Sequence, residues 1–239
     1  MFVDECDPAV GTIYGVHDNP NFIVTNTEYY PNFLCALIKR ILDSNKRFES
    51  KVRLITTWAF YFEGKRFFEG NRTLVTNKNI EKPILNAFRM LSKLGTTRVR
   101  VRSSHARDVL DQSAPSVEID ALAAVAGERV TVLVWHQCDE WWRAGQAQIQ
   151  IQVDHLPFAG RAVVRRYQID DAHSNAYAEW VRQGSPQNPT EAQIQQIKNR
   201  QGLELWESLR SAQVADDGSL IVDLELPLFG TGLIEIEKV

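Results

Sequence analysis

The stretch Gln148-Ile-Gln-Ile-Gln-Val153 alternates polar and apolar residues without a break. Successive side chains of a β-strand point to opposite faces, so a period of two is typical of a strand with one buried face. The same pattern starts near Thr96 and recurs to the C-terminus, with further candidate strands at 98–102, 117–122, 130–135, 161–169, 219–226 and 232–237. Seven short strands at this spacing predict an antiparallel β-sandwich over residues 96–239.

Two segments within this region lack the alternation. Ala172–Arg182 and Thr190–Arg200 are predicted helices, separated by Gly184-Ser-Pro-Gln-Asn-Pro189. Glycine and proline interrupt helices, so this stretch is the expected break between them. The sandwich is therefore predicted to carry a helical insertion over about 172–200.

Residues 1–95 follow a different pattern. Apolar pairs from Tyr30 to Asp43 recur at helical spacing and predict an amphipathic helix. Val52–Phe60 is β-branched and aromatic, which predicts a strand buried on both faces. Pro83 and Gly95 bracket a second helix, as helix ends prefer. The order strand end, helix, strand, helix matches the last two βα units of a (β/α)8 barrel, which is incomplete within this sequence.

Composition excludes several classes of protein. The chain has 239 residues and a net charge of −3, which provides no basic surface for nucleic acid or an anionic membrane. The sequence contains no run of about 18 apolar residues, so no membrane span is predicted. No signal peptide is visible at Met1. The sequence therefore leaves the compartment of the protein open. The three cysteines lack metal-site spacing, and His136-x-Cys138 falls short of a full ligand set, so no metal is expected.

Three blocks of sequence carry a family resemblance. The first is Asp4-Glu-Cys-Asp-Pro-Ala-Val-Gly11, and the second runs from Arg72-Thr-Leu to Lys82-Pro-Ile-Leu-Asn-Ala-Phe-Arg-Met-Leu91. The third is Tyr167-Gln-Ile-Asp-Asp-Ala-His-Ser-Asn-Ala-Tyr177, continued by Trp180 and by Gly184–Thr190. Together they resemble glycoside hydrolase family 39, the family of β-xylosidases and α-L-iduronidases. The third block is the most specific, because its length makes a chance match improbable.

The resemblance implies a catalytic role for Glu5. In this family the glutamate of the first block is the nucleophile of a retaining glycosidase, which needs a second carboxyl about 5–5.5 Å away as acid/base. The family carries that acid/base in an Asn-Glu-Pro motif, which is absent from this sequence. The chain is thus expected to be the C-terminal portion of a retaining glycoside hydrolase that cleaves β-xylosides or α-L-iduronide-like sugars. Alone it is expected to be inactive; its partners are a carbohydrate substrate and a missing N-terminal barrel segment, and no cofactor is implied.

Four further residues are candidates for substrate binding. Asp7 either hydrogen-bonds near the sugar or caps the following turn. Trp58 either stacks on the sugar or packs in the core. Arg72 matches the iduronidase arginine that holds the uronate carboxylate, for which a guanidinium fork is suited; the alternative is a surface arginine. Glu63 either hydrogen-bonds sugar hydroxyls or is a solvated loop charge.

An alternative function also stays open at this point. The chain is then a non-catalytic carbohydrate-binding or structural β-sandwich module with a vestigial barrel remnant. Trp135, Trp141 and Trp142 would form its sugar-stacking platform, although aromatic residues are more often core. His173 and Asn175 are expected to order the long loop of the third block through hydrogen bonds.

Overall fold

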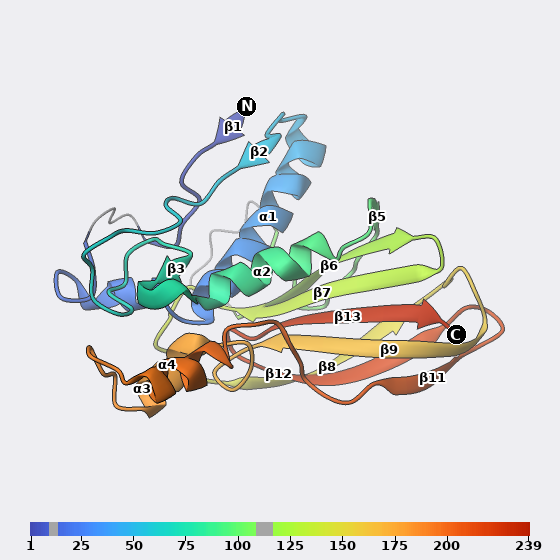
Figure 1. The fold of residues 1–239 in the computed structure, drawn as a ribbon. Coiled ribbons are helices and arrows are strands. Elements are labelled where there is room, and N and C mark those ends of the chain that lie inside the picture. Colours follow the sequence, from blue (N-terminus) through green and yellow to red (C-terminus); the bar gives the residue numbers. More distant parts are fainter. Residues whose placement is uncertain (10–13, 109–116) are drawn as a thin grey trace.

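The computed structural model describes residues 1–9, 14–108 and 117–239 (Figure 1). Val10 and Gly11, which end the first of the three sequence blocks, lie outside the described residues. The protein is a mixed α/β structure with several antiparallel sheets. The largest sheet has the strand order β10 (Glu204–Leu205), β9 (Gly160–Ile169), β13 (Thr231–Lys238), β7 (Arg129–Gln137), β6 (Glu118–Ala126), β5 (Thr97–Val99), with β11 (Arg210–Val214) also paired to β9.

A second, two-stranded sheet packs against this one. It pairs β8 (Gln146–Val153) with β12 (Leu220–Pro227). Ile149 and Ile151 of β8 face an apolar cluster that also contains Val132 of β7 and Ile234 of β13. The glutamines of β8 are exposed. The period-two prediction for this strand is therefore confirmed.

The opposite face of the large sheet is covered by two helices. In Figure 1, α1 (Tyr29–Phe48) and α2 (Pro83–Ser92) lie over the β6–β7 side of that sheet. Leu133 and Trp135 of β7 contact Leu34 of α1 and Ile84 of α2 in a second apolar cluster. Since β7 is buried on both faces, Val132–Trp135 at its centre is apolar throughout, and the alternation expected over residues 130–135 does not continue there.

Ion pairs fix α1 on the sheet. Lys39 lies 2.8 Å from Asp120, and Arg40 lies 2.6 Å from Glu118. Glu118 also accepts a hydrogen bond of 3.0 Å from the indole N–H of Trp135. Both carboxylates are buried and come from β6. Trp135 is therefore a core residue, which is the more common role of such aromatic residues, and it is not available for the alternative platform of three tryptophans.

The first helix after β9 begins later than the sequence predicted. Asp170 accepts hydrogen bonds of 2.7 Å from the backbone N–H groups of both Ala172 and His173, which closes a turn. Asn175 then caps α3 (Ala176–Arg182) by accepting from the N–H of Ala178. The predicted helix start at Ala172 is wrong, whereas the ordering role expected of His173 and Asn175 is confirmed. The second helix, α4 (Glu191–Lys198), follows Thr190 as predicted.

The N-terminal region contains a short βαβ unit. The strand β1 (Phe2–Val3) pairs in parallel with β2 (Leu54–Ile55), and α1 connects them after the 3-10 turn η1 (Pro20–Thr25). The hairpin β3 (Val75–Thr76) and β4 (Ile80–Glu81), joined by η2 (Asn77–Asn79), leads into α2.

Two strand predictions need correction. Val52–Phe60 forms a strand only at Leu54–Ile55, and Leu54 and Phe60 are 51% and 62% exposed. A strand is buried on both faces only when other layers cover it, and in the described residues β2 pairs with β1 alone. The strand predicted over Arg98–Arg102 is limited to Thr97–Val99, at the edge of the large sheet.

Candidate active site

Glu5 and Asp7 lie directly after β1, where the chain leaves its parallel pairing with β2. The N–H of Cys6 donates to the carbonyl of Thr56 at 2.7 Å, and the N–H of Asp7 donates to the carbonyl of Glu5 at 3.0 Å. This tight turn places Glu5 at a φ of 59°, in the left-handed region. A non-glycine residue there costs roughly 1–3 kcal/mol, and such strain concentrates at functional sites.

Arg72 joins the two carboxylates. Its Nη2 lies 3.2 Å from Oε2 of Glu5, and its Nη1 lies 3.1 Å from Oδ2 of Asp7. The side chains of Arg72 and Asp7 are 4% and 0% exposed, whereas that of Glu5 is 38% exposed. The ion pairs therefore hold one buried carboxylate and one that solvent, or a ligand, can reach.

Asp7 is further held by two hydrogen bonds. The hydroxyl of Tyr30, in the first turn of α1, donates to Oδ1 of Asp7, and the backbone N–H of Trp58 donates to Oδ2 at 3.2 Å. Burial raises the pKa of the Asp7 carboxyl above its ordinary value, while the hydrogen bonds from Tyr30 and Trp58 and the charge of Arg72 oppose that rise. Burial, followed by the bond to Asp7, raises the pKa of Tyr30. Asp7 thus acts as a buried anchor for the elements around Glu5.

Trp58 lies beside the same cluster. Its ring centroid is 5.3 Å from Cζ of Arg72, a cation–π distance, and the residue is 39% exposed. The position is therefore partly open, and Trp58 is not a core residue. Trp58 follows β2 in the same way that Glu5 follows β1, so both stand beyond the C-terminal ends of parallel strands.

Glu63 stays apart from this cluster. It is exposed in the turn Glu63–Gly64 and joins none of the contacts that the described residues make around Arg72. The structure therefore brings together Glu5, Asp7, Trp58 and Arg72, four of the five predicted site residues.

Tyr30 is a member of the site that the sequence prediction missed. Helical periodicity placed it only in the buried face of a helix, together with Leu34. Its hydroxyl bond to Asp7, a residue 23 positions earlier, depends on how α1 packs against the loop after β1. A tyrosine on an otherwise apolar helix face was the available signal, since a buried hydroxyl needs a partner.

Among the described residues, neither a group of metal-ligating side chains nor a membrane-spanning helix is found. Within residues 1–9, 14–108 and 117–239, no group of three or more His, Cys, Asp or Glu side chains is placed to hold a metal ion. No helix in those same ranges has the length and apolar character needed to cross a membrane. Cys6, Cys35 and Cys138 are buried free thiols.

Solved structures share this fold. The bacterial orthologue of human α-L-iduronidase is 21% identical, with a TM-score of 0.75 over 100% of this chain and 41% of that chain. The GH39 enzyme from Xanthomonas axonopodis pv. citri is 19% identical, with a TM-score of 0.69 over 91% of this chain and 42% of that one. A monomeric β-xylosidase from Caulobacter crescentus CB15 is 19% identical, with a TM-score of 0.68 over 91% and 43%. The chain thus spans about two fifths of the length of these structures.

Sequence comparison identifies the family. No curated protein matches the chain. The model of glycosyl hydrolases family 39, however, matches residues 16–203, well over half of the 239 residues. The match includes the second and third of the blocks quoted above. The chain therefore belongs to glycosyl hydrolases family 39, as those blocks predicted.

Proposed function

We propose that this chain carries the nucleophile of a retaining glycosidase, with Glu5 in that role. The observation that carries the proposal is the reachable Glu5 carboxylate, held 3.2 Å from the buried guanidinium of Arg72. A nucleophile must be anionic and must be aimed at the anomeric carbon. The ion pair with Arg72 and the turn at Glu5 restrict the carboxylate in that way, while its exposure leaves room for a sugar.

The βαβ unit supports a second part of the proposal. We infer that residues 1–95 are the last two βα units of a (β/α)8 barrel and that residues 96–239 are its β-sandwich accessory domain. In such barrels the catalytic groups stand at the C-terminal ends of the strands. Glu5 and Trp58 occupy these positions relative to β1 and β2.

A second carboxyl must come from elsewhere. Retaining hydrolysis needs an acid/base to protonate the leaving oxygen, and the family's Asn-Glu-Pro motif is absent from this sequence. We propose that a barrel segment outside this sequence supplies it. The exposed apolar residues Phe2, Leu54 and Phe60 would pack against that segment. The chain alone is expected to show no aryl-xyloside hydrolysis.

Charge favours a neutral sugar over a uronide. Arg72 contributes one positive charge and already faces two carboxylates, Glu5 and Asp7. Among the described residues, Arg72 is the cation paired with these two carboxylates, and a uronate would bring a further negative charge beside them. The β-xyloside class is therefore the proposed substrate, with Trp58 as the partly open aromatic surface for the sugar.

Trapping tests the assignment. This chain is fused to the upstream barrel segment of a solved family 39 enzyme and treated with a 2-fluoro-xylosyl inhibitor, followed by peptide mapping. We expect the label on Glu5 and a loss of turnover by several orders of magnitude in Glu5→Gln. Glu49→Gln is the matched control, because Glu49 is also an exposed glutamate with positive φ. Label on any other residue, or an inverted product anomer, contradicts the proposal.

The alternative is a non-catalytic carbohydrate-binding or structural module. The three tryptophans do not form one flat surface for a sugar, since Trp135 is buried and the rings of Trp141 and Trp142 meet at 82°, edge to face. The fused protein distinguishes the two functions. A module of this kind binds sugar, if at all, without acquiring the covalent label.

A further inference from the structure

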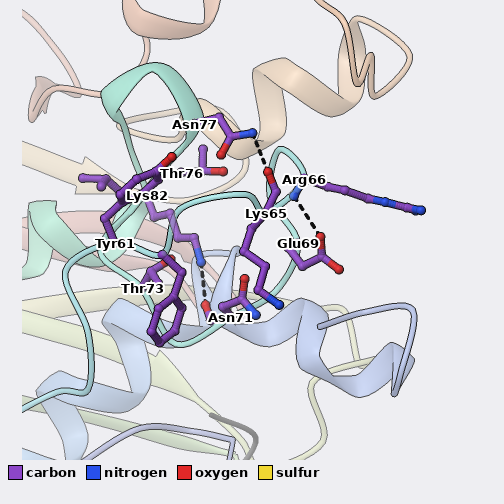
Figure 2. Close-up of a pocket in the computed structure, with 11 residues that line it drawn as sticks. Tyr61, Lys65, Arg66, Glu69, Asn71, Thr73, Thr76, Asn77 and Lys82 are labelled. Carbon is purple, nitrogen blue, oxygen red and sulfur yellow. Dashed lines mark hydrogen bonds between the residues drawn. The ribbon is translucent and has the colours of Figure 1, made fainter. Parts of the chain in front are cut away.

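Lys82 is a fully buried lysine at the start of α2. The residue is 1% exposed, and its side chain makes no capping bond to the helix. Its Nζ donates a hydrogen bond of 2.7 Å to the backbone carbonyl of Asn71, which Figure 2 shows as a dashed line. The adjoining cavity of about 10 Å³ has room for no more than about one water. Lys82 is therefore not placed to bind a substrate group directly.

The carbonyl that Lys82 binds belongs to the turn that carries Arg72. The oxygen of Asn71 also accepts the N–H of Thr73 at 2.8 Å, so a three-residue turn closes around Arg72. On the other side, the carbonyl of Arg72 accepts the N–H of Ala59 at 3.2 Å. Both peptide groups flanking Arg72 are thus held, one of them by the ammonium of Lys82.

Burying this ammonium is costly. Burial lowers the pKa of Lys82 to about 7, and an apolar side chain of similar shape avoids that cost. The backbone N–H of Lys82 already ties the start of α2 to the carbonyl of Leu74 at 2.9 Å. Anchoring the helix therefore does not require a charged side chain at residue 82. The contact that the ammonium of Lys82 does make is the hydrogen bond to the Asn71 carbonyl, in the turn that carries Arg72.

We propose that Lys82 is a positioning residue for Arg72. Its ammonium holds the Asn71 carbonyl, fixes the turn, and so aims the guanidinium at Glu5 and Asp7. The importance of Lys82 for sugar cleavage rests on the proposed function, whereas the positioning itself is a property of the folded chain.

The titration of Asp7 reports the position of Arg72. The charge of Arg72 lowers the pKa of Asp7, so a displaced guanidinium must let that pKa rise. The experiment follows the Asp7 carboxyl carbon by NMR in the purified chain and its variants. Lys82→Met removes the ammonium and keeps an unbranched apolar side chain. Arg72→Met removes the guanidinium altogether and so gives the largest expected rise in the pKa of Asp7, about one pKa unit or more.

Lys93→Met is the matched control, because Lys93 lies just beyond the other end of α2 and pairs with Glu235. We expect Lys82→Met to raise the pKa of Asp7 by at least half of the Arg72→Met shift, and Lys93→Met to leave it unchanged. An unchanged Asp7 titration in a folded Lys82→Met overturns the proposal. If that variant does not fold, Lys82→Leu, which likewise has no hydrogen-bond donor, is titrated instead, with the same two outcomes. The readout uses neither sugar nor turnover, so its failure and a failure of the nucleophile assignment are distinguishable.

Discussion

Replacing Lys82 with methionine should change the pH dependence of stability in a direction that the structure determines. The folded chain lowers the pKa of Lys82 from 10.5 to about 7 because the ammonium is buried. Between these values the unfolded chain binds a proton that the folded chain does not. Stability of the wild type therefore rises with pH through this window, and the burial penalty is complete below about pH 7.

The magnitude follows from the shift. One pKa unit corresponds to about 1.4 kcal/mol, so the full penalty is several kcal/mol in order of magnitude. Over the range from about pH 7 to about pH 9, the wild type should gain roughly 2 kcal/mol relative to Lys82→Met, which has no such group. Other groups that titrate in this range, such as thiols, are common to both proteins and cancel in the difference.

Urea denaturation at several pH values measures this difference, with the free energy of unfolding obtained by linear extrapolation. Lys93→Met controls for the loss of an ammonium group beside the same helix. If the stability difference between the wild type and Lys82→Met is constant from about pH 7 to about pH 9, then Lys82 does not titrate as its burial requires. The reasoning about its cost would then be refuted.

Three further predictions concern stability and use the same urea assay. Arg72→Met should destabilise the chain by about 3 kcal/mol near neutral pH, because buried Asp7 loses its cation; the loss should shrink as the pH falls and Asp7 protonates, and a pH-independent loss would contradict this. Leu133→Ala should cost about 3 kcal/mol, since Leu133 is fully buried between α1, α2 and the large sheet, whereas exposed Leu209→Ala should cost under about 0.5 kcal/mol. Asn175→Ala should lower the free energy of unfolding by more than the loss of about 1 kcal/mol expected for removing the cap in Thr190→Ala, because Asn175 also donates to Glu28 at 3.0 Å and to the carbonyl of Asp170 at 2.9 Å. Equal losses in the two variants would rule out a contribution from these added bonds.

Local patterns in the sequence located most regular elements of this protein. Alternation of polar and apolar residues identified Gln148–Val153, which lies within β8, and proline at the entry identified α2. These signals succeed because side-chain direction repeats every two residues in a strand and every 3.6 in a helix. The three sequence blocks also identified the family, which the family model confirms over residues 16–203.

Burial was beyond the reach of those patterns. Val52–Phe60 has the composition of a buried strand, yet only Leu54–Ile55 forms a regular strand, Ala59 makes an isolated bridge to Thr73, and Phe60 is largely exposed. Burial is a property of what packs around a segment, and composition alone carries no information on which neighbours are present.

The candidate site shows the same division. The sequence by itself determined which residue types lie after the first strand, namely Glu5 and Asp7, and named Arg72 only as a candidate for holding a substrate carboxylate. The pairing of Arg72 with both Glu5 and Asp7 came from the structure. Only the tertiary structure decided that Tyr30 anchors Asp7 and that Lys82 holds the turn of Arg72. The reason is physical: these contacts join side chains to atoms on other elements, and their formation depends on the packing of α1 and α2, which no local periodicity encodes.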